Sequence, residues 1–360
     1  MIFKVYQNYL GKTFLITFIK AVFIFIGLAF ILNIFEEINF FKDLEVSLTL
    51  PIFLTFLNIP SIIFEIFPFI FLISTQFFFI KLIEQNENVA FKNFGLSNLK
   101  IISLLSTISF LVGVLIVTIF YNLSSNLKHS YLNIKNSYAK DNKYLAVITE
   151  NGIWIKDENR GVTSIVNAEK LDNKYLKNVD IIQFDEKFNF LQNISSKEVL
   201  IEKKNWKIKK GIINNEIYSN QKIEDYELVT NINFDDINSL FSNLTSLSIF
   251  ELGKLKKKYE DINYSSIEVN SALQKILAFP IYLTLMTILA SAIMMNIKQN
   301  RSKIFHLIFG ILISVIIYYL SFFFEELGKN EQIPVMVSIW IPLLMISLIS
   351  LISLVRINEK

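Results

Sequence analysis

Long apolar segments separated by short polar ones dominate both ends of the chain. A helix needs about 20 mostly apolar residues to cross the hydrocarbon core of a bilayer. Six segments reach that length: Leu15–Ile34, the later part of Ile52–Ile80, Ile101–Phe120, Ile276–Ile297, Ile304–Phe324 and Ile333–Val355. The pattern predicts three membrane-spanning helices before residue 121 and three more after residue 271.

The central segment, residues 121–271, is polar and has the pattern of short β-strands. Tyr144–Thr149 and Ile153–Lys156 are rich in residues that favour strands, and Asn151-Gly152 lies between them. This arrangement is typical of a β-hairpin, because a type I′ turn needs positive φ at both central residues. Several short strands at such spacing predict an all-β domain, either a sandwich or a jelly roll.

Three further elements are predicted in the central segment. Val199–Glu202 and Trp206–Lys209 are additional strand candidates. Ile249–Tyr259 has the spacing of a short amphipathic helix, and Ser248 is of a residue type that caps helix N-termini. This helix is predicted to lead the chain back to the membrane.

Positive charge in the short loops predicts the orientation of the helices, because Lys and Arg are enriched on the cytoplasmic side. Basic residues occupy both termini and the loops after the second and fourth spans: Lys4, Lys12, Lys81, Lys92, Lys100, Lys298, Arg301, Lys303, Arg356 and Lys360. The alternate short loops carry carboxylates instead, with Lys42 and Lys329 as exceptions: Glu36, Glu37, Asp43, Glu45, Glu325, Glu326 and Glu331. Both termini are therefore predicted to be cytoplasmic, and residues 121–271 to lie on the opposite side.

Composition argues against several kinds of site. The 360-residue chain is 52% hydrophobic and has no cysteine, so disulfides, thiolate nucleophiles and cysteine metal sites are excluded. His129 and His306 are the only histidines and fall on opposite sides of the predicted membrane, which argues against a His-based triad or metal site. Gly11-Lys12-Thr13 resembles the end of a phosphate loop, but Tyr6 stands where that loop needs an earlier glycine. The net charge of +3 gives no argument for nucleic acid. We predict a non-catalytic chain with no metal and no cofactor.

Two charged features have both a functional and a structural interpretation. A carboxylate inside a membrane span is costly, so Glu65 is a candidate for a proton relay. Its place between Pro60 and Pro68 favours instead the outer end of the second span, at the interface. Lysine clusters in the central segment either attract an anionic ligand or, as we favour, form solvated faces: Lys203, Lys204, Lys207, Lys209, Lys210, Lys256, Lys257 and Lys258.

Motifs in five parts of the chain match one family pattern in order and spacing. They are Tyr9-Leu10-Gly11-Lys12, the pair Pro60 and Pro68 before the second helix, Glu87–Gly95, the set Pro280, Met286 and Ala290, and the set Gly310, Tyr318, Pro334, Trp340 and Pro342. Each match alone is weak. Together with the three-plus-three layout, they resemble the LptF/LptG permeases of the lipopolysaccharide export transporter.

The resemblance implies a membrane α-helical fold with six transmembrane helices and an inserted periplasmic β-jellyroll domain. It divides the chain into residues 1–120, with a cytoplasmic coupling helix at about 83–99, residues 121–271 and residues 272–360. It also implies a multi-pass protein of the bacterial inner membrane. Asn151–Asp157 and Tyr9–Lys12 are more similar to the LptG branch than to the LptF branch.

The function implied by the resemblance is that of a permease subunit of an ABC transporter. Such a subunit extracts lipopolysaccharide from the inner membrane and passes it to a periplasmic bridge towards the outer membrane. The implied partners are an LptF-like paralogue, an LptB-type ATPase dimer that uses the ATP, and the bridge proteins LptC and LptA. A membrane-anchored periplasmic scaffold and a permease of the same fold for another lipid are the alternatives.

Two sets of site residues follow from the resemblance. Glu87, Lys92 and Gly95 lie in the segment that couples such permeases to the ATPase, where the acidic residue pairs with the ATPase and the glycine ends the helix. The first and fifth helices would line the substrate cavity, with the candidate residues Phe23, Phe30, Asn33, Leu312 and Ile316. Those side chains could equally face lipid or other helices. Asn33 stands where many family members have a basic residue suited to phosphates, so phosphate recognition there would fall to another group.

Overall fold

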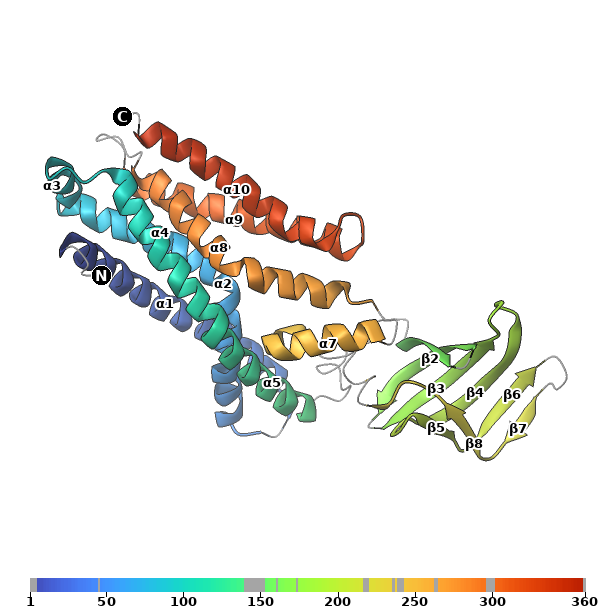
Figure 1. Ribbon diagram of the computed structural model, residues 1–360. Coiled ribbons are helices and arrows are strands. Elements are labelled where there is room, and N and C mark those ends of the chain that lie inside the picture. The colour runs from blue at the N-terminus through green and yellow to red at the C-terminus, as the bar shows by residue number, and fades with distance from the viewer. Residues whose placement is uncertain are drawn as a thin grey trace. The chain divides into compact units, whose positions relative to one another are not determined.

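The computed structural model describes residues 5–44, 46–138, 153–159, 161–172, 174–215, 220–234, 237, 243–261, 265–295 and 302–358. The chain forms two compact units (Figure 1). One unit, called here the helical unit, combines Met1–Tyr131 with Asn270–Lys360, and the other, the β unit, is Leu132–Val269.

Six helical segments are long and apolar enough to cross a membrane, as predicted. The helices of the chain outside the β-sheet region are α1 (Val5–Phe40), α2 (Thr49–Glu84), α3 (Glu87–Asn93), α4 (Asn98–Leu115), a π-helical turn (Ile116–Phe120), α5 (Tyr121–Tyr138), α8 (Ile267–Met295), α9 (Lys303–Lys329) and α10 (Val335–Asn358). The third span is α4, the π-helical turn and α5 in one continuous segment.

Several helices are longer than the apolar pattern alone predicts, and two of these extensions change the predicted layout. The third span continues to Tyr138, whereas residues from 121 onward were assigned to the β domain. Its extension keeps a helical spacing of buried positions, with Tyr121, Ser125 and Leu132 on one face. Likewise α2 begins at Thr49, so that Pro60 and Pro68 lie inside the helix rather than before it. Proline is tolerated within membrane helices because neighbouring groups satisfy the freed backbone carbonyl.

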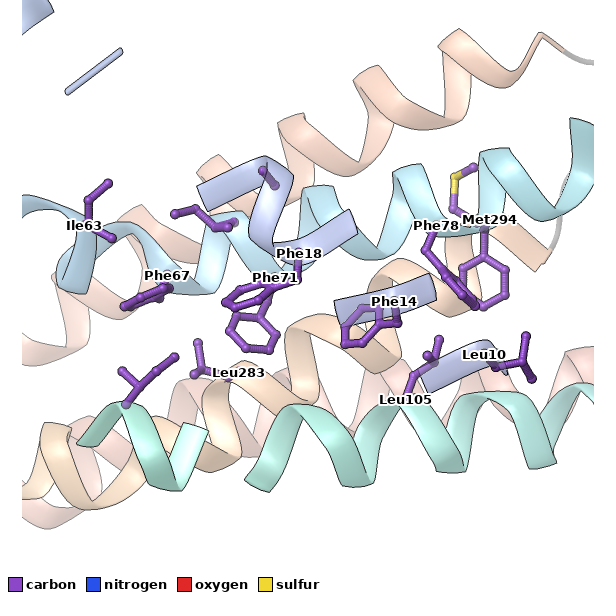
Figure 2. Packing of buried hydrophobic residues seen from close by; sticks show 14 of the residues in the cluster. Leu10, Phe14, Phe18, Ile63, Phe67, Phe71, Phe78, Leu105, Leu283 and Met294 are labelled. Carbon is purple, nitrogen blue, oxygen red and sulfur yellow. The ribbon is translucent and has the colours of Figure 1, made fainter. Parts of the chain in front are cut away.

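Phenylalanine is the most frequent residue type in the larger buried cluster of the helical unit. Phe14 and Phe18 of α1 meet Phe78 and Phe71 of α2, with ring centroids 5.8 and 4.5 Å apart (Figure 2). Buried residues of α4 and α8 complete this cluster, Leu105 and Leu283 among them. Edge-to-face and tilted contacts of this kind stabilise aromatic pairs beyond their buried area.

Small residues allow two of the helix pairs to approach closely. A Cβ at Gly113 of α4 would lie 2.9 Å from the backbone of Pro280 in α8, so only glycine fits this crossing. A Cβ at Gly310 of α9 would lie 2.0 Å from Gln76 of α2, whose Nε2 donates to the carbonyl of His306 at 3.0 Å. Membrane helices commonly pack through such small residues and interhelical hydrogen bonds.

The β unit contains one antiparallel sheet that curls, as Figure 1 shows. Its strands are β1 (Ile153–Asn159), β2 (Val162–Asp172), β3 (Tyr175–Phe184), β4 (Phe190–Leu200), β5 (Asn205–Ile208), β6 (Gly211–Asn215), β7 (Gln221–Ile223) and β8 (Tyr226–Val229). The order is β1-β2-β3-β4-β5-β8, and β6 pairs with both β4 and β7. Thus the long strand β4 is paired with β6 over its first part and with β5 at its end.

The register of the sheet builds its apolar core. One row of directly paired residues crosses five strands and is buried throughout: Ile155, Val166, Ile181, Ile194 and Ile213. Side chains alternate between the two faces of a strand, so this pairing places the row on one face of the sheet. The fully buried Trp206 of β5 adds to the same cluster.

The predicted fold class, six membrane-capable helices with an inserted antiparallel β domain, is confirmed. Of the predicted strands, Ile153–Lys156 lies in β1, and Trp206–Lys209 corresponds to β5. Only the first two residues of Val199–Glu202 are in a strand, at the end of β4. Tyr144–Thr149 and the Asn151-Gly152 turn lie outside the described residues.

The predicted short helix is α7 (Ile249–Asp261). It begins with a capping box, in which the backbone N–H of Ser248 donates to Glu251 Oε2 at 2.8 Å. In return the backbone N–H of Glu251 donates to Ser248 Oγ at 3.3 Å. These two bonds satisfy backbone donors that the first turn of a helix leaves unpaired.

Candidate functional site

The segment between the second and third spans forms a separate short helix, α3, which contains two of the predicted coupling residues, Glu87 and Lys92. Asn86 before it and Gly95 after it have positive φ, at 54° and 76°. The Leu96 N–H donates to the Phe91 carbonyl at 2.9 Å. This is the longer bond of a Schellman motif, in which glycine at the left-handed position ends a helix at least cost. The side chain of Lys92 lies outside the described part of the structure.

The side chain of Glu87 is held by α1. Tyr9 donates its hydroxyl proton to Glu87 Oε1 at 2.5 Å, and its ring lies 6.5 Å from the ring of Phe91. The second carboxylate oxygen, Oε2, is covered and accepts no hydrogen bond from the described residues. Hydrogen bonds to an ionised acceptor are among the stronger ones in proteins. The first turns of α1 and the start of α3 are therefore directly connected.

Two large apolar side chains are exposed in this region. Val89 in α3 is 53% exposed, and Phe94, directly after the helix, is 85% exposed. By contrast, Phe91 packs against the buried cluster of the helical unit. Single exposed apolar side chains are ordinary, but two beside a carboxylate on a short helix suit a protein contact.

The five predicted cavity residues divide into two groups. Phe23 on α1 and Leu312 and Ile316 on α9 are exposed apolar side chains. Phe30 packs instead against Phe56 of α2, with ring centroids 5.1 Å apart. Phe30 is thus partly buried, and Asn33 is buried.

Asn33 belongs to a polar network near the end of α1. Asn58 of α2 donates its amide Nδ2 to Asn33 Oδ1 at 3.3 Å, and Lys128 Nζ of α5 donates to Asn58 Oδ1 at 2.5 Å. One turn further along α1, the fully buried Glu37 accepts a hydrogen bond from Tyr131 of α5 at 2.7 Å. The network joins three helices and brings a lysine close to Asn33.

A second ionic cluster joins α8 and α9. The carboxylate of Glu325 is paired with Lys275 Nζ at 2.8 Å and with Lys329 Nζ at 3.1 Å. Lys329 also contacts Glu326 at 3.0 Å. Lys128 and Lys275 were not selected from sequence, because both lie on helical extensions of a span rather than in a loop. The sequence feature that could have identified these two lysines is the helical spacing of polar residues that continues beyond the apolar segment.

The residues of the family motifs hold helices together in several places. A Cβ at Gly11 would lie 3.1 Å from Ile108 of α4. Met286 and Ala290 of α8 are fully buried, and Trp340 of α10 donates its indole N–H to Gln274 at 3.1 Å. Of the other motif residues, Lys12, Tyr318 and Pro334 are exposed, and Pro342 lies inside α10.

The remaining charged candidates lie on the surface. Glu65 is an exposed residue of α2. Two lysines of the basic clusters are near carboxylates, Lys207 at 3.6 Å from Glu227 and Lys256 at 4.0 Å from Glu260. Within the described ranges, no group of three histidine or acidic side chains could hold a metal ion. The described surface thus offers helix faces and a docking segment as its candidate sites.

Comparison with known protein families gives one match over nearly the whole chain. The family described as lipopolysaccharide export system permease LptF/LptG matches residues 8–356. No curated protein sequence matches the chain.

Proposed function

Because the chain belongs to the LptF/LptG family of lipopolysaccharide export permeases, we propose that it extracts lipopolysaccharide from the inner membrane and passes it to a periplasmic bridge. Family membership makes it a multi-pass inner-membrane protein and a non-catalytic permease component of an ABC transporter. The proposal concerns the transport steps, the partners and the residues that carry them.

The observation that carries the proposal is the unequal burial of the six spans. In the most apolar window of each span, 56% of α2 and 72% of α8 is buried within the chain, but only 17% of α1 and 17% of α9. The first and fifth spans therefore present most of their apolar surface outward. Long lipid acyl chains need an apolar wall, and these two helices supply one.

The exposed side chains Phe23, Leu312 and Ile316 are the proposed contacts for acyl chains. Phe30 and Asn33 are proposed to support this surface rather than to contact acyl chains, because Phe30 packs on α2 and Asn33 accepts a hydrogen bond from Asn58. In place of a basic residue at position 33, Lys128 lies in the same network. Phosphate recognition at this end of α1 would then fall to the partner subunit or require Lys128 to turn outward.

The coupling proposal rests on α3. Its carboxylate Glu87, exposed Val89 and Phe94, and the sharp end at Gly95 suit docking into a groove of an ATPase. Lys92 is a further proposed contact in the same segment. The ATPase would be a dimer of the LptB type, which binds and hydrolyses the ATP.

The other proposed partners follow from the family. They are an LptF-like paralogue that completes the cavity with its own first and fifth helices, and the bridge proteins LptC and LptA. We place the chain in the LptG-like branch, with both termini in the cytoplasm and the β unit in the periplasm. Reporter fusions within residues 160–240 test this orientation, because activity of a cytoplasmic reporter there would contradict it.

Co-purification with the candidate partners, followed by ATPase measurements in lipid nanodiscs, tests the coupling. Glu87→Lys should abolish the lipopolysaccharide-stimulated part of the ATPase activity, because it places like charge where a cation of the ATPase is expected. Glu84→Lys is the matched control: it makes the same charge change three residues earlier, at the end of α2, where Glu84 lies 3.4 Å from Lys303. Equal loss in both variants, or no loss in Glu87→Lys, would contradict a specific role of Glu87.

Photocrosslinking tests the proposed wall. A photoreactive amino acid at Phe23 or Ile316 should crosslink to lipopolysaccharide during ATP turnover. The same group at Leu348 of α10, which is equally exposed, should crosslink mainly to bulk phospholipid. Equal crosslinking at all three positions would mean that α1 and α9 contact only bulk lipid, as a scaffold protein would. Preferential crosslinking to a different lipid would support a permease for that lipid.

A further inference from the structure

We propose that Tyr9 is a positioning residue for α3: its hydroxyl and ring fix the proposed docking segment on α1, so that the two helices move as one body. The inference rests on the proposed coupling function of α3 and extends it to the helix that would face the substrate. In this role Tyr9 acts through Glu87 and Phe91 of α3.

Two contacts of different kinds attach α3 to Tyr9. The hydroxyl donates to Glu87 Oε1 at 2.5 Å, in the first turn of α3. The ring lies 6.5 Å from that of Phe91, one turn later, with the planes tilted by 49°. A polar and an aromatic contact on successive turns fix both the position and the rotation of a short helix.

The base to which α3 is attached is rigid. Leu10, the next residue after Tyr9, is completely buried in the phenylalanine-rich core. Gly11 follows, where a side chain would press on Ile108 of α4 at 3.1 Å. Figure 2 shows Leu10 and Phe14 pointing into this core beside Leu105 and Phe78. Consecutive residues therefore serve different tasks: Tyr9 holds α3, Leu10 fills the core, and Gly11 allows α1 to approach α4.

By itself α3 has little to fix its orientation. It has only seven residues, and isolated helices of that length are unstable in water. Its two connections run through residues with positive φ, Asn86 and Gly95, at which the chain changes direction. Because the flanking turns set its ends but not its rotation, contacts with the rest of the helical unit must do so.

The contact has a mechanical consequence. Glu87 Oε1 accepts the hydrogen bond from Tyr9, and Oε2 is covered. A cation of an ATPase that approaches this carboxylate would therefore meet a group that is already bonded to α1. Force on α3 therefore reaches α1 directly, across 78 positions of sequence. Since α1 is one of the two least buried spans, this is a short route from the proposed docking segment to the proposed substrate wall.

A spin label on α3 tests the anchor directly. The chain has no cysteine, so Ala90→Cys, at an exposed position of α3, gives a single labelling site. Tyr9→Phe keeps the ring contact but removes the hydroxyl, and the mobile fraction of the label should rise at least twofold in nanodiscs. Tyr6→Phe removes a phenol one turn earlier on α1 and should leave the spectrum unchanged. An unchanged spectrum in Tyr9→Phe would overturn the proposal.

The second measurement asks whether the anchor serves coupling. In the complete transporter, Tyr9→Phe should lower the ratio of lipopolysaccharide-stimulated to basal ATPase activity by about 3- to 10-fold, which lies within the range expected for a typical intramolecular hydrogen bond. The basal kcat and the KM for ATP should stay unchanged, since the ATPase itself is intact. A mobile label with an unchanged ratio would overturn the proposed link to α1. Failure of the coupling function itself would appear separately, as normal stimulation in Phe94→Ala, which removes an exposed side chain of the proposed docking segment and leaves Tyr9 and Glu87 intact.

Discussion

In the β unit the row from Ile155 to Ile213 crosses five strands without a polar side chain, whereas in the helical unit the buried interior contains Gln76, Ser109 and Thr287. Ser109 of α4 and Thr287 of α8 bond to each other at 2.8 Å, and Gln76 bonds to the carbonyl of His306. Both units bury phenylalanine, isoleucine or leucine at their centres, but the buried polar groups of the β unit, such as the bonded pair Gln183 and Ser164, lie outside its apolar row.

The difference follows from the solvent of each unit. Apolar burial drives the folding of a sheet in water, so its core gains most from continuous apolar contact. Helices already inside a bilayer gain little from apolar burial, because lipid tails are equally apolar. Close backbone approach and interhelical hydrogen bonds then decide which faces meet, as at Gly113 and Pro280. The comparison predicts that different kinds of substitution will damage each unit.

The largest effect is expected from a cavity in the β core. Trp206 is completely buried, and its indole N–H donates to the Ile232 carbonyl at 2.7 Å. Trp206→Ala should therefore reduce the stability of the β unit by about 3–5 kcal/mol. Hydrogen exchange of the β4, β5 and β8 amides in the full chain measures this cost.

Trp154→Ala is the control in the same sheet, because Trp154 is 57% exposed on β1. It should change exchange little, since a surface substitution rarely costs more than about 0.5 kcal/mol. Similar protection in both variants would mean that the apolar row does not dominate the stability of the β unit.

A smaller but still clear effect is expected from adding one methyl group between two membrane helices. Gly113→Ala would place its Cβ 2.9 Å from the backbone of Pro280, which cannot turn aside as a side chain could. Overpacking of this kind costs about 1–3 kcal/mol. The measurement is the thermal unfolding temperature of the chain in detergent micelles.

Gly27→Ala provides the matched control within a span. Outside the local backbone of α1 itself, no heavy atom lies within 4 Å of a Cβ at Gly27, so the added methyl group meets no neighbouring helix. Alanine also favours a helix over glycine by about 1 kcal/mol, so this variant should be neutral or slightly stabilised. If both variants unfold at the same temperature, close approach of α4 and α8 does not hold the helical unit together.

The contrast between the units also explains what the sequence could predict. The apolar periodicity was sufficient for the six spans and the β character of the central segment, because both depend on which residues leave water. It did not predict the helical extension to Tyr138, since polar residues there satisfy one another through Lys128 and Tyr131 across helices. Such partners are distant in sequence, and no local pattern identifies them.

In the candidate site, too, a local sequence pattern predicts some features, and others depend on partners that are distant in sequence. Gly95 could be assigned to the end of a helix from its residue type, and it has the positive φ that this position requires. The partner of Glu87 could not be predicted, because Tyr9 is 78 positions away. Similarly, the sequence places Phe23 and Phe30 on α1, but only packing against Phe56 distinguishes the partly buried Phe30 from the exposed Phe23.

The smallest effect concerns a buried carboxylate of the β unit. Asp157 of β1 is 5% exposed, and burial raises the pKa of its carboxyl group above the usual value, although the backbone N–H and side chain of Asn231 favour the charged form. Since the folded-state pKa lies above the unfolded one, the folded chain binds the extra proton more tightly. Stability therefore falls as the pH rises through the window between the two values, and at neutral pH the charged carboxylate costs stability.

Asp157→Asn should remove that cost while keeping an oxygen that can accept from the Asn231 N–H at 3.3 Å. We expect the β unit to gain about 1 kcal/mol of stability at pH 7. The gain should disappear below the usual aspartate pKa of about 4, where the side chain at position 157 is neutral in both the original protein and the variant. Hydrogen exchange at both pH values, corrected for intrinsic rates, measures the difference. A loss of stability at pH 7 would show that the charge of Asp157 is compensated by Asn231 and Lys204, and that the β core tolerates buried charge as the helical core tolerates buried amides and hydroxyls.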